Sequence, residues 1–216
     1  MGYDVVIFDM DGTLLDTLDD MMDSCNYALS TIGAPPRTWA EIRRFVGNGI
    51  RNLMIKAVPG GEENPQFEQA YETMQTWYQA HNQIKTAPYP GVQQLIHTLS
   101  EQGVPMAVVS NKPDSSVQML VEQWFPEITF GLGERDGLRR KPERDMVDYA
   151  IEQLGQAGKR AVYVGDSEVD LATAANAGLD CISVTWGFRD RDLLEEHGAV
   201  RFADNTDELL ALIQGA

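Results

Sequence analysis

The stretch Val5-Val6-Ile7-Phe8-Asp9-Met10-Asp11-Gly12-Thr13 decides the fold of this chain. Its first four residues are apolar and rich in β-branched types, which predicts a short buried strand of a parallel sheet. Ligands of open α/β sheets bind beyond the carboxyl ends of the strands, so Asp9 and Asp11 are expected at that rim. Two close carboxylates repel each other unless a cation or a shared proton relieves them, and hard oxygen ligands of this kind suit Mg²⁺. A strand followed by an Asp/Gly turn would explain the same residues without a metal.

The composition is that of a globular protein with a strong acidic excess. The chain has 216 residues, of which 43% are hydrophobic and 23% charged, so it is long enough to bury a large core. Its 17 basic and 33 acidic residues give a net charge of −16, which argues against a nucleic-acid partner. No apolar run approaches the roughly 20 residues of a membrane helix, and no signal peptide is visible. We therefore expect a cytoplasmic protein with no membrane partner, and Cys25 and Cys181 as free thiols.

The order of the predicted elements indicates the fold class. After the first strand the pattern is helical up to about residue 85, and two pairs, Thr17 with Asp20 and Thr38 with Glu41, are typical of helix starts. From residue 88 onward, apolar strands alternate with helices, including a short strand at 128–130 and a helix beginning at Pro142. Such alternation predicts a doubly wound, parallel α/β sheet. The helical stretch is then an insertion after the first strand.

Three further polar motifs follow apolar strands of the predicted sheet. Val108-Val109-Ser110-Asn111-Lys112-Pro113 ends a strand in a hydroxyl, which suits a phosphate at a helix start, although a plain helix cap is the alternative. Lys141-Pro142 is expected to open a helix, where an ammonium is poorly placed for the helix dipole and calls for an anion. Gly165-Asp166-Ser167-Glu168-Val169-Asp170 brings a third carboxylate to the rim of the sheet, although acids at a helix start are favourable in themselves.

Together these motifs resemble the signatures of the haloacid dehalogenase superfamily. Asp9-Met10-Asp11-Gly12-Thr13-Leu14, followed by Asp16-Thr17, is similar to the family's first signature. The family also places a Ser or Thr at the end of a second strand, a Lys before a helix and a late acidic cluster, and this chain has candidates for all three in that order. One departure is Arg144, which stands where relatives often carry a second proline.

The resemblance implies a catalytic chemistry for the first signature. Its members are phosphatases that work through an aspartyl-phosphate, so Asp9 is expected to attack phosphorus. Asp11 is expected to protonate the leaving oxygen and then to activate the water that hydrolyses the intermediate. The resemblance further implies that Mg²⁺ is held by the Asp9 carboxylate, the Asp11 backbone carbonyl and Asp166. Asp170 is expected beside the metal, either as a direct ligand or one contact further away.

The resemblance also assigns the phosphate-binding residues and the domains. Ser110, assisted by Asn111, is expected to bind the phosphoryl group, while Lys141 steadies its charge and that of the nucleophile. The fold expected is a Rossmann-like core of residues 1–14 and 86–216 with an all-helical cap domain of residues 15–85. The cap is expected to cover the crevice of the sheet and to select the leaving group.

The substrate expectation depends on the helical insertion. Phe45-Val46-Gly47-Asn48-Gly49-Ile50-Arg51 resembles the cap loop of phosphoglycolate phosphatases. Backbone N–H groups of Gly47, Asn48 and Gly49 could receive a small carboxylate, and Arg44 or Arg51 could pair with it. A tight interhelical turn with two surface arginines explains the same residues. The expected substrate is 2-phosphoglycolate or a similarly small phosphorylated metabolite, and the expected state is a monomer or homodimer.

Three other activities are compatible with the same motifs. A β-phosphoglucomutase-like phosphotransferase would share every core signature and shield the intermediate from water. A pyrophosphatase or nucleotidase would differ only in the leaving group. A phospho-ligand sensor with an inactive site is the alternative outside enzymology.

Overall fold

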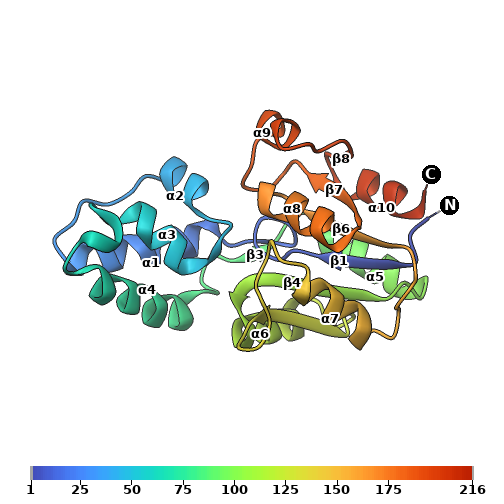
Figure 1. Ribbon diagram of the computed structural model, residues 1–216, viewed down its shortest axis with the longest axis horizontal. Helices are drawn as coiled ribbons and strands as arrows, with labels where there is room; N and C mark the ends of the chain where they lie inside the picture. The colour runs from blue at the N-terminus through green and yellow to red at the C-terminus, as the bar shows by residue number, and fades with distance from the viewer. Residues whose placement is uncertain (1, 216) are drawn as a thin grey trace. The chain divides into compact units, whose positions relative to one another are not determined.

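The computed structural model describes residues 2–215 and divides them into two compact units (Figure 1). The sheet unit comprises the chain up to Leu15 together with everything from Pro88 onward, and the helical unit is Asp16–Ala87. The chain leaves the sheet unit in β2 (Leu15–Asp16) and returns in β3 (Ala87–Pro88), and these two short strands pair with each other.

The sheet unit is built on six parallel strands in the order β5-β4-β1-β6-β7-β8. These strands are β1 (Val5–Phe8), β4 (Met106–Pro113), β5 (Phe130–Glu134), β6 (Ala161–Gly165), β7 (Asp180–Val184) and β8 (Phe202–Ala203). All four residues of β1 are buried, because β1 has a partner strand on each side and a helical layer over each face. The predicted doubly wound α/β fold is confirmed.

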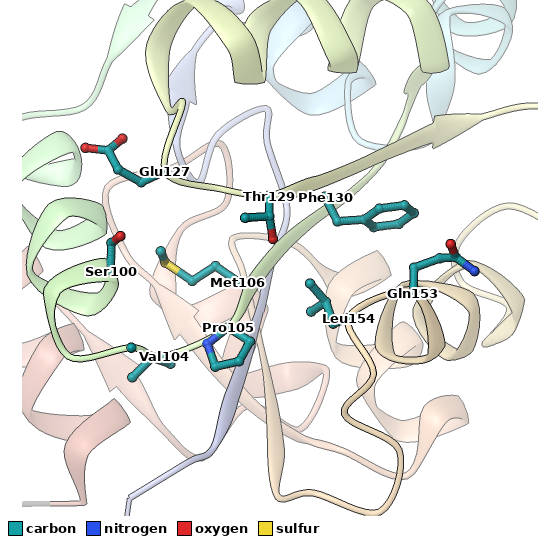
Figure 2. A pocket seen from close by; sticks show the side chains of 10 residues that line it. Ser100, Val104, Pro105, Met106, Glu127, Thr129, Phe130, Gln153 and Leu154 are labelled. Atoms are coloured by element: carbon teal, nitrogen blue, oxygen red, sulfur yellow. The ribbon is translucent and has the colours of Figure 1, made fainter.

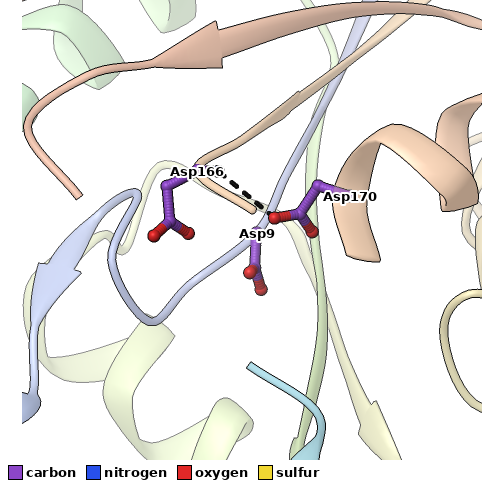
Figure 3. A group of neighbouring side chains, drawn as sticks. All are labelled: Asp9, Asp166 and Asp170. Carbon is purple, nitrogen blue, oxygen red and sulfur yellow. Dashed lines mark hydrogen bonds between the residues drawn. The ribbon is translucent and has the colours of Figure 1, made fainter. Parts of the chain in front are cut away.

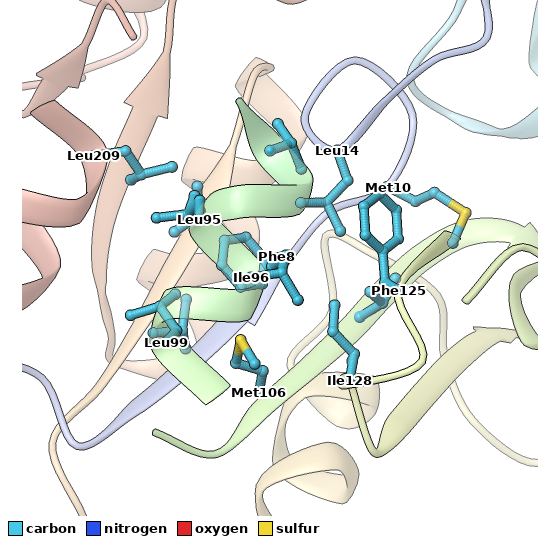
Figure 4. Close-up of a cluster of buried hydrophobic side chains, with 14 of the residues drawn as sticks. Phe8, Met10, Leu14, Leu95, Ile96, Leu99, Met106, Phe125, Ile128 and Leu209 are labelled. Atoms are coloured by element: carbon cyan, nitrogen blue, oxygen red, sulfur yellow. The ribbon is translucent and has the colours of Figure 1, made fainter. Parts of the chain in front are cut away.

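Alternate residues of β1 supply the two halves of the core. Val6 and Phe8 face the helices α5 (Val92–Glu101), α6 (Asp114–Trp124) and α10 (Thr206–Gln214), and Figure 4 shows Phe8 among side chains of α5. Val5 and Ile7 face α7 (Asp145–Gln153) and α8 (Glu168–Ala177). This period of two is what a strand covered on both faces requires. The remaining helix of the unit is α9 (Arg191–Glu196).

The helical unit contains four α-helices and one 3₁₀ turn within Asp16–Ala87. They are α1 (Leu18–Thr31), α2 (Trp39–Phe45), α3 (Gly49–Ala57), η1 (Gly61–Glu63) and α4 (Phe67–His81). Helix α1 packs against α2 and α4, and α3 packs against α4. The capping box predicted for Thr38 and Glu41 is confirmed at the start of α2. Among residues 2–215, no helix is both long enough and apolar enough to cross a membrane.

One expected capping box and two expected element boundaries are wrong. Thr17 precedes α1 without a side-chain cap bond, because Asp20 instead accepts hydrogen bonds from the N–H groups of Lys85 and Thr86 at 3.0 and 2.9 Å. The strand expected at 128–130 runs from 130 to 134. The strand was not predicted at this place because its two glycines interrupt the apolar pattern. Glycine is needed at Gly133, since a Cβ there would come within 2.5 Å of backbone atoms of residues 112 and 114. The helix expected to begin at Pro142 begins at Asp145.

Candidate functional site

The strand order gathers the predicted site residues of the sheet unit. Strands β4, β1 and β6 are neighbours and run parallel, so their carboxyl ends lie side by side. Asp9 directly follows β1, Ser110 lies in the last half of β4, and Asp166 directly follows β6. Residues about 100 and 50 positions apart in the sequence thus meet at one edge of the sheet, where open α/β folds bind ligands.

An acidic cluster lies at this edge. One carboxylate oxygen from each of Asp9, Asp166 and Asp170 lies within 4.8 Å of the others, and all three residues are buried (Figure 3). Burial and the neighbouring Asp170 raise the pKa of Asp9 well above its usual range, against the lowering effect of Lys141. The same two causes raise the pKa of Asp166 to about 7. Crowded carboxylates whose charges oppose one another suit a hard cation.

Lys141 supplies a positive charge inside the cluster. Its Nζ atom lies 2.9 Å from Asp9 Oδ1 and 2.8 Å from Asp170 Oδ1, and it donates to the Tyr163 hydroxyl at 3.0 Å. That hydroxyl donates in turn to the Val109 carbonyl at 3.0 Å. Although burial favours the neutral amine, Asp170 and Asp9 raise the pKa of Lys141 well above its usual range. Lys141 lies in the turn before α7 and not at the first residue of the helix. Its ammonium is therefore positioned by its ion pairs with the carboxylates and not by the helix terminus.

Asp170 is occupied by protein donors at both oxygens. Oδ1 receives Lys141. Oδ2 accepts from the Asp166 N–H at 3.2 Å, the Ser167 N–H at 3.0 Å and the Ser167 hydroxyl at 2.6 Å. Asp170 therefore holds Lys141 and the loop after β6 in place, and its oxygens have little capacity left for a cation.

Asp166 is held on two sides while its carboxylate stays in the cluster. Its Oδ2 accepts from the Phe188 N–H at 2.7 Å, and its Oδ1 accepts from the Thr13 hydroxyl at 3.3 Å. Two glycines make room for it. A Cβ on Gly12 would lie 2.3 Å from Asp166 Oδ2, and one on Gly187 would lie 2.4 Å from Asp166 Cβ.

Asp11 and the end of β4 form a second polar group at the same edge. The Lys112 Nζ donates to Asp11 Oδ1 at 2.9 Å and Oδ2 at 3.3 Å. The Ser110 hydroxyl accepts from the Lys112 N–H at 3.3 Å. Asn111 Nδ2 donates to the Lys141 carbonyl at 3.1 Å, whereas Asn111 Oδ1 is buried without a hydrogen-bond partner in residues 2–215. The contacts of Lys112 and Tyr163 were not predicted from the sequence.

The other predicted binding residues belong to the helical unit. Gly47 and Gly49 have φ angles of +113° and +75°, and Asn48 between them precedes α3. Arg51 forms ion pairs with Glu62 at 3.0 Å and Glu68 at 2.7 Å. The Gly47–Gly49 turn therefore depends on glycine, and the Arg51 guanidinium has carboxylate partners within its own unit.

A separate hollow of about 470 Å³ lies at the amino ends of β4 and β5 (Figure 2). It is lined by the starts of these strands, including Met106 and Phe130, and by the ends of α5 and α7. Its charged lining residue is Glu127, which would repel a phosphate. The acidic cluster, at the carboxyl ends of the strands, is the better candidate for phosphate chemistry.

Comparisons with known proteins agree with this geometry. The sequence model of the haloacid dehalogenase-like hydrolases matches residues 6–184. The chain belongs to this family and is one of its phosphatases. A phosphoglycolate phosphatase from Pseudomonas putida KT2440 is 31% identical, covering 98% of this chain and 79% of that protein. One from Agrobacterium fabrum C58 is 34% identical, covering 88% of this chain and 84% of that protein.

A solved structure is similar over its full length. The crystal structure of a candidate phosphoglycolate phosphatase from Lactobacillus delbrueckii subsp. bulgaricus superposes with a TM-score of 0.95 at 38% identity, covering 100% of both chains. The close agreement extends the likeness from the sheet to the whole chain.

Proposed function

We propose that the protein is a Mg²⁺-dependent phosphomonoesterase that forms an aspartyl-phosphate on Asp9. The observation that carries this proposal is the buried contact of the Asp9 carboxylate with Lys141, beside Asp166 and Asp170. A carboxylate needs no separate base to act as a nucleophile once it is ionised. Lys141 favours that ionised form by its charge.

The reaction divides into two displacements at phosphorus. An oxygen of Asp9 attacks, the bond from phosphorus to the leaving oxygen breaks, and Asp11 delivers a proton to that oxygen. In the second displacement Asp11 takes a proton from water, whose oxygen attacks the aspartyl-phosphate. The bond between phosphorus and the Asp9 oxygen then breaks, releasing inorganic phosphate. Asp11 suits both roles because its side chain keeps 17% exposure at the rim.

The residues of the cluster fit a magnesium ion. The carboxylates of Asp9 and Asp166 and the backbone carbonyl of Asp11 would hold it, since all are hard oxygen donors. Bound Mg²⁺ supplies positive charge against the oxygens of the transferring group. Asp170 is assigned an indirect part, through Lys141 and the loop after β6, because its own oxygens accept four hydrogen bonds.

The phosphoryl group is assigned to three residues of the sheet unit. Ser110 would donate its hydroxyl, Asn111 would contribute a backbone N–H, and Lys141 would contribute charge. Backbone and side-chain donors at a strand end suit phosphate oxygens. Each of the three lies at the same strand-end edge as Asp9.

The proposed substrate is 2-phosphoglycolate, and the proposed cap is the helical unit. The names of the relatives support the substrate, and the turn at Gly47, Asn48 and Gly49 offers N–H groups to a carboxylate. Arg51 is the less favoured of the predicted cap ligands, since Glu62 and Glu68 already bind it. A cytoplasmic location and a monomeric or homodimeric state remain predictions.

Phosphate release tests this proposal. 2-Phosphoglycolate is compared with sugar phosphates, nucleotides and pyrophosphate, with Mg²⁺ or with a chelator. Asp9→Asn should lose at least about 10⁴-fold in kcat, whereas Asp136→Asn, at an exposed aspartate outside the cluster, should not. Activity retained by Asp9→Asn would refute the nucleophile. Equal turnover across the panel would refute the substrate, and retention of label in a bisphosphate sugar would indicate a phosphotransferase.

A further inference from the structure

Lys112 is a buried cation that the proposed reaction leaves without a role. Its side chain is 2% exposed, although it stands at the rim of the sheet at the end of β4. Buried ammonium groups need a charged partner, and here the Asp11 carboxylate binds Nζ through both oxygens, at 2.9 and 3.3 Å. The carboxylate partner of this lysine at 2.9 Å is therefore the proposed proton donor.

This pairing conflicts with the proposed work of Asp11. An oxygen that accepts a hydrogen bond from Nζ is not free to deliver a proton to the leaving oxygen. A general acid acts within about 3.2 Å of that oxygen, and Asp11 Oδ1 is 2.9 Å from Nζ. The ammonium and the leaving oxygen thus come within about 6 Å of each other. The three covalent bonds from the leaving oxygen to a carboxylate oxygen of a 2-oxyacid span about 3.5 Å, and a hydrogen bond of about 3 Å from that carboxylate to Nζ covers the rest.

We propose that Lys112 binds a carboxylate on the leaving group and so determines substrate specificity. In the free enzyme Asp11 pairs with Lys112. The carboxylate of a phosphorylated 2-hydroxy acid replaces Asp11 at Nζ, and the Asp11 oxygens then turn to the leaving oxygen. A neutral leaving group leaves the Lys112–Asp11 pair in place. This inference rests on the proposed phosphatase mechanism and assigns carboxylate recognition to the sheet unit.

Neighbouring cations of the sheet unit are committed to other carboxylates. Lys141 is held by Asp9 and Asp170, and Arg189 pairs with Glu168 at 2.7 Å. If a substrate carboxylate replaced the partners of Lys141, it would disturb the acidic cluster. If it replaced Glu168 at Arg189, it would disturb the start of α8. If a substrate carboxylate replaces Asp11 at Lys112, the acidic cluster stays intact, because Asp11 is the residue that must move toward the substrate.

The test compares matched pairs of substrates that differ in the carboxylate. One pair is 2-phosphoglycolate and ethyl phosphate, and the other is 2-phospholactate and isopropyl phosphate. The quantity measured is kcat/KM for the acid divided by kcat/KM for its neutral partner. Lys112→Met should lower this ratio about 10- to 100-fold in both pairs, the range of one charge-assisted hydrogen bond. Lys112→Arg should restore part of it, and Lys159→Met, at an exposed lysine, should keep the wild-type ratio.

The ratio separates the possible roles of Lys112. An unchanged ratio would overturn the inference, and this includes an equal loss of kcat/KM for both members of a pair. Lys112 would then only position Asp11 or stabilise the fold. A wild-type enzyme with no preference for the acid would overturn it as well. Preference for 2-phospholactate with a lowered ratio in Lys112→Met would refute the proposed substrate and support the inference. Lys112→Gln provides a second neutral variant if Lys112→Met does not fold.

Discussion

Gly12 combines two demands that few positions share. Its φ angle is +88°, in the left-handed region, and a Cβ at this position would lie 2.3 Å from Asp166 Oδ2. Gly137 has the same φ of +88° but nothing within 4 Å of its hypothetical Cβ. Alanine at Gly137 would therefore cause backbone strain alone, whereas alanine at Gly12 would cause the same strain and also displace the Asp166 carboxylate.

Gly12→Ala should raise the Mg²⁺ concentration needed for half-maximal activity by about 10- to 100-fold, as the loss of a supporting contact does at metal sites. Gly137→Ala should cost stability alone, about 1 kcal/mol. Titration of activity with Mg²⁺ and thermal unfolding of both variants check this. Equal Mg²⁺ dependence in the two variants would mean that Asp166 does not need its present position.

Sequence reasoning predicted the candidate site residues that belong to strand-end motifs. Asp9, Asp166 and Lys141 were predicted because their residue types and order match a family pattern. Lys112 and Tyr163 were not, because their contacts depend on which strands are neighbours. Tyr163 belongs to β6, and its hydroxyl donates to the Val109 carbonyl on β4, although β1 lies between these two strands in the sheet. No local sequence pattern predicts a contact between strands that are not adjacent.

At the scale of elements, one aspartate joins the two ends of the helical unit. Asp20 on α1 is buried and accepts from the N–H groups of Lys85 and Thr86 and from the Thr86 hydroxyl. Asp20→Ala would leave buried donors without a partner, so unfolding free energy should fall by about 2–3 kcal/mol or more. Asp19→Ala, at an exposed neighbour, should change it by less than about 0.5 kcal/mol. Urea unfolding measures both, and equal effects would contradict the role given to Asp20.

A second cluster joins the amino ends of several strands. Asp180, the first residue of β7, accepts from the Tyr3 hydroxyl at 2.7 Å and pairs with Arg201 at 2.8 Å and Arg160 at 3.4 Å. The bonds from Tyr3 and Arg201 lower the pKa of Asp180 below its usual range. Folding is therefore favoured above the unfolded-state pKa of about 4 and loses this contribution as pH falls through the lower folded-state pKa.

Asp180→Asn should reduce stability at pH 7 by about 1 kcal/mol or less, since the pair is partly exposed. The difference from wild type should shrink as pH falls below about 4 and vanish once the pH lies below the lower folded-state pKa. Urea unfolding midpoints on both sides of that pH check the sign, with Asp192→Asn at an exposed aspartate as control. A difference that grows in acid would contradict the assignment.

Element boundaries were the weakest part of the sequence prediction. Thr17 and Asp20 have the spacing of a capping box, yet Asp20 binds backbone more than 60 residues away. The strand at 130–134 contains two glycines that lower its strand propensity, and its place is fixed by pairing with β4. In each case a distant partner outweighed the local signal.

At the scale of the molecule, charge opposes the proposed substrate. The net charge is −16, so the long-range field repels a phosphorylated carboxylate. Raising salt from about 10 to about 150 mM shortens the Debye length from roughly 30 to 8 Å. We expect kcat/KM for 2-phosphoglycolate to rise about two- to tenfold over this range, with kcat nearly constant. A fall in kcat/KM would mean that the lysines of the site and the proposed Mg²⁺ outweigh the net charge in the approach of the substrate.

The alternation of strands and helices predicted the architecture of the sheet unit because β1, β6 and the first half of β4 are buried and read as apolar runs. The strand order β5-β4-β1-β6-β7-β8 does not follow from those runs, since parallel strands can be arranged in several orders with the same pattern.

The central position of β1 has a consequence for synthesis of the chain on the ribosome. Asp9 emerges before its partners at the ends of β4 and β6, and of the acidic cluster Asp166 and Asp170 come last. A nascent chain that ends before β6 has neither Asp166 nor Asp170 and cannot assemble the acidic cluster. The proposed metal affinity would therefore appear only in chains translated past Asp170, so shorter products would not compete with the finished enzyme for the ion.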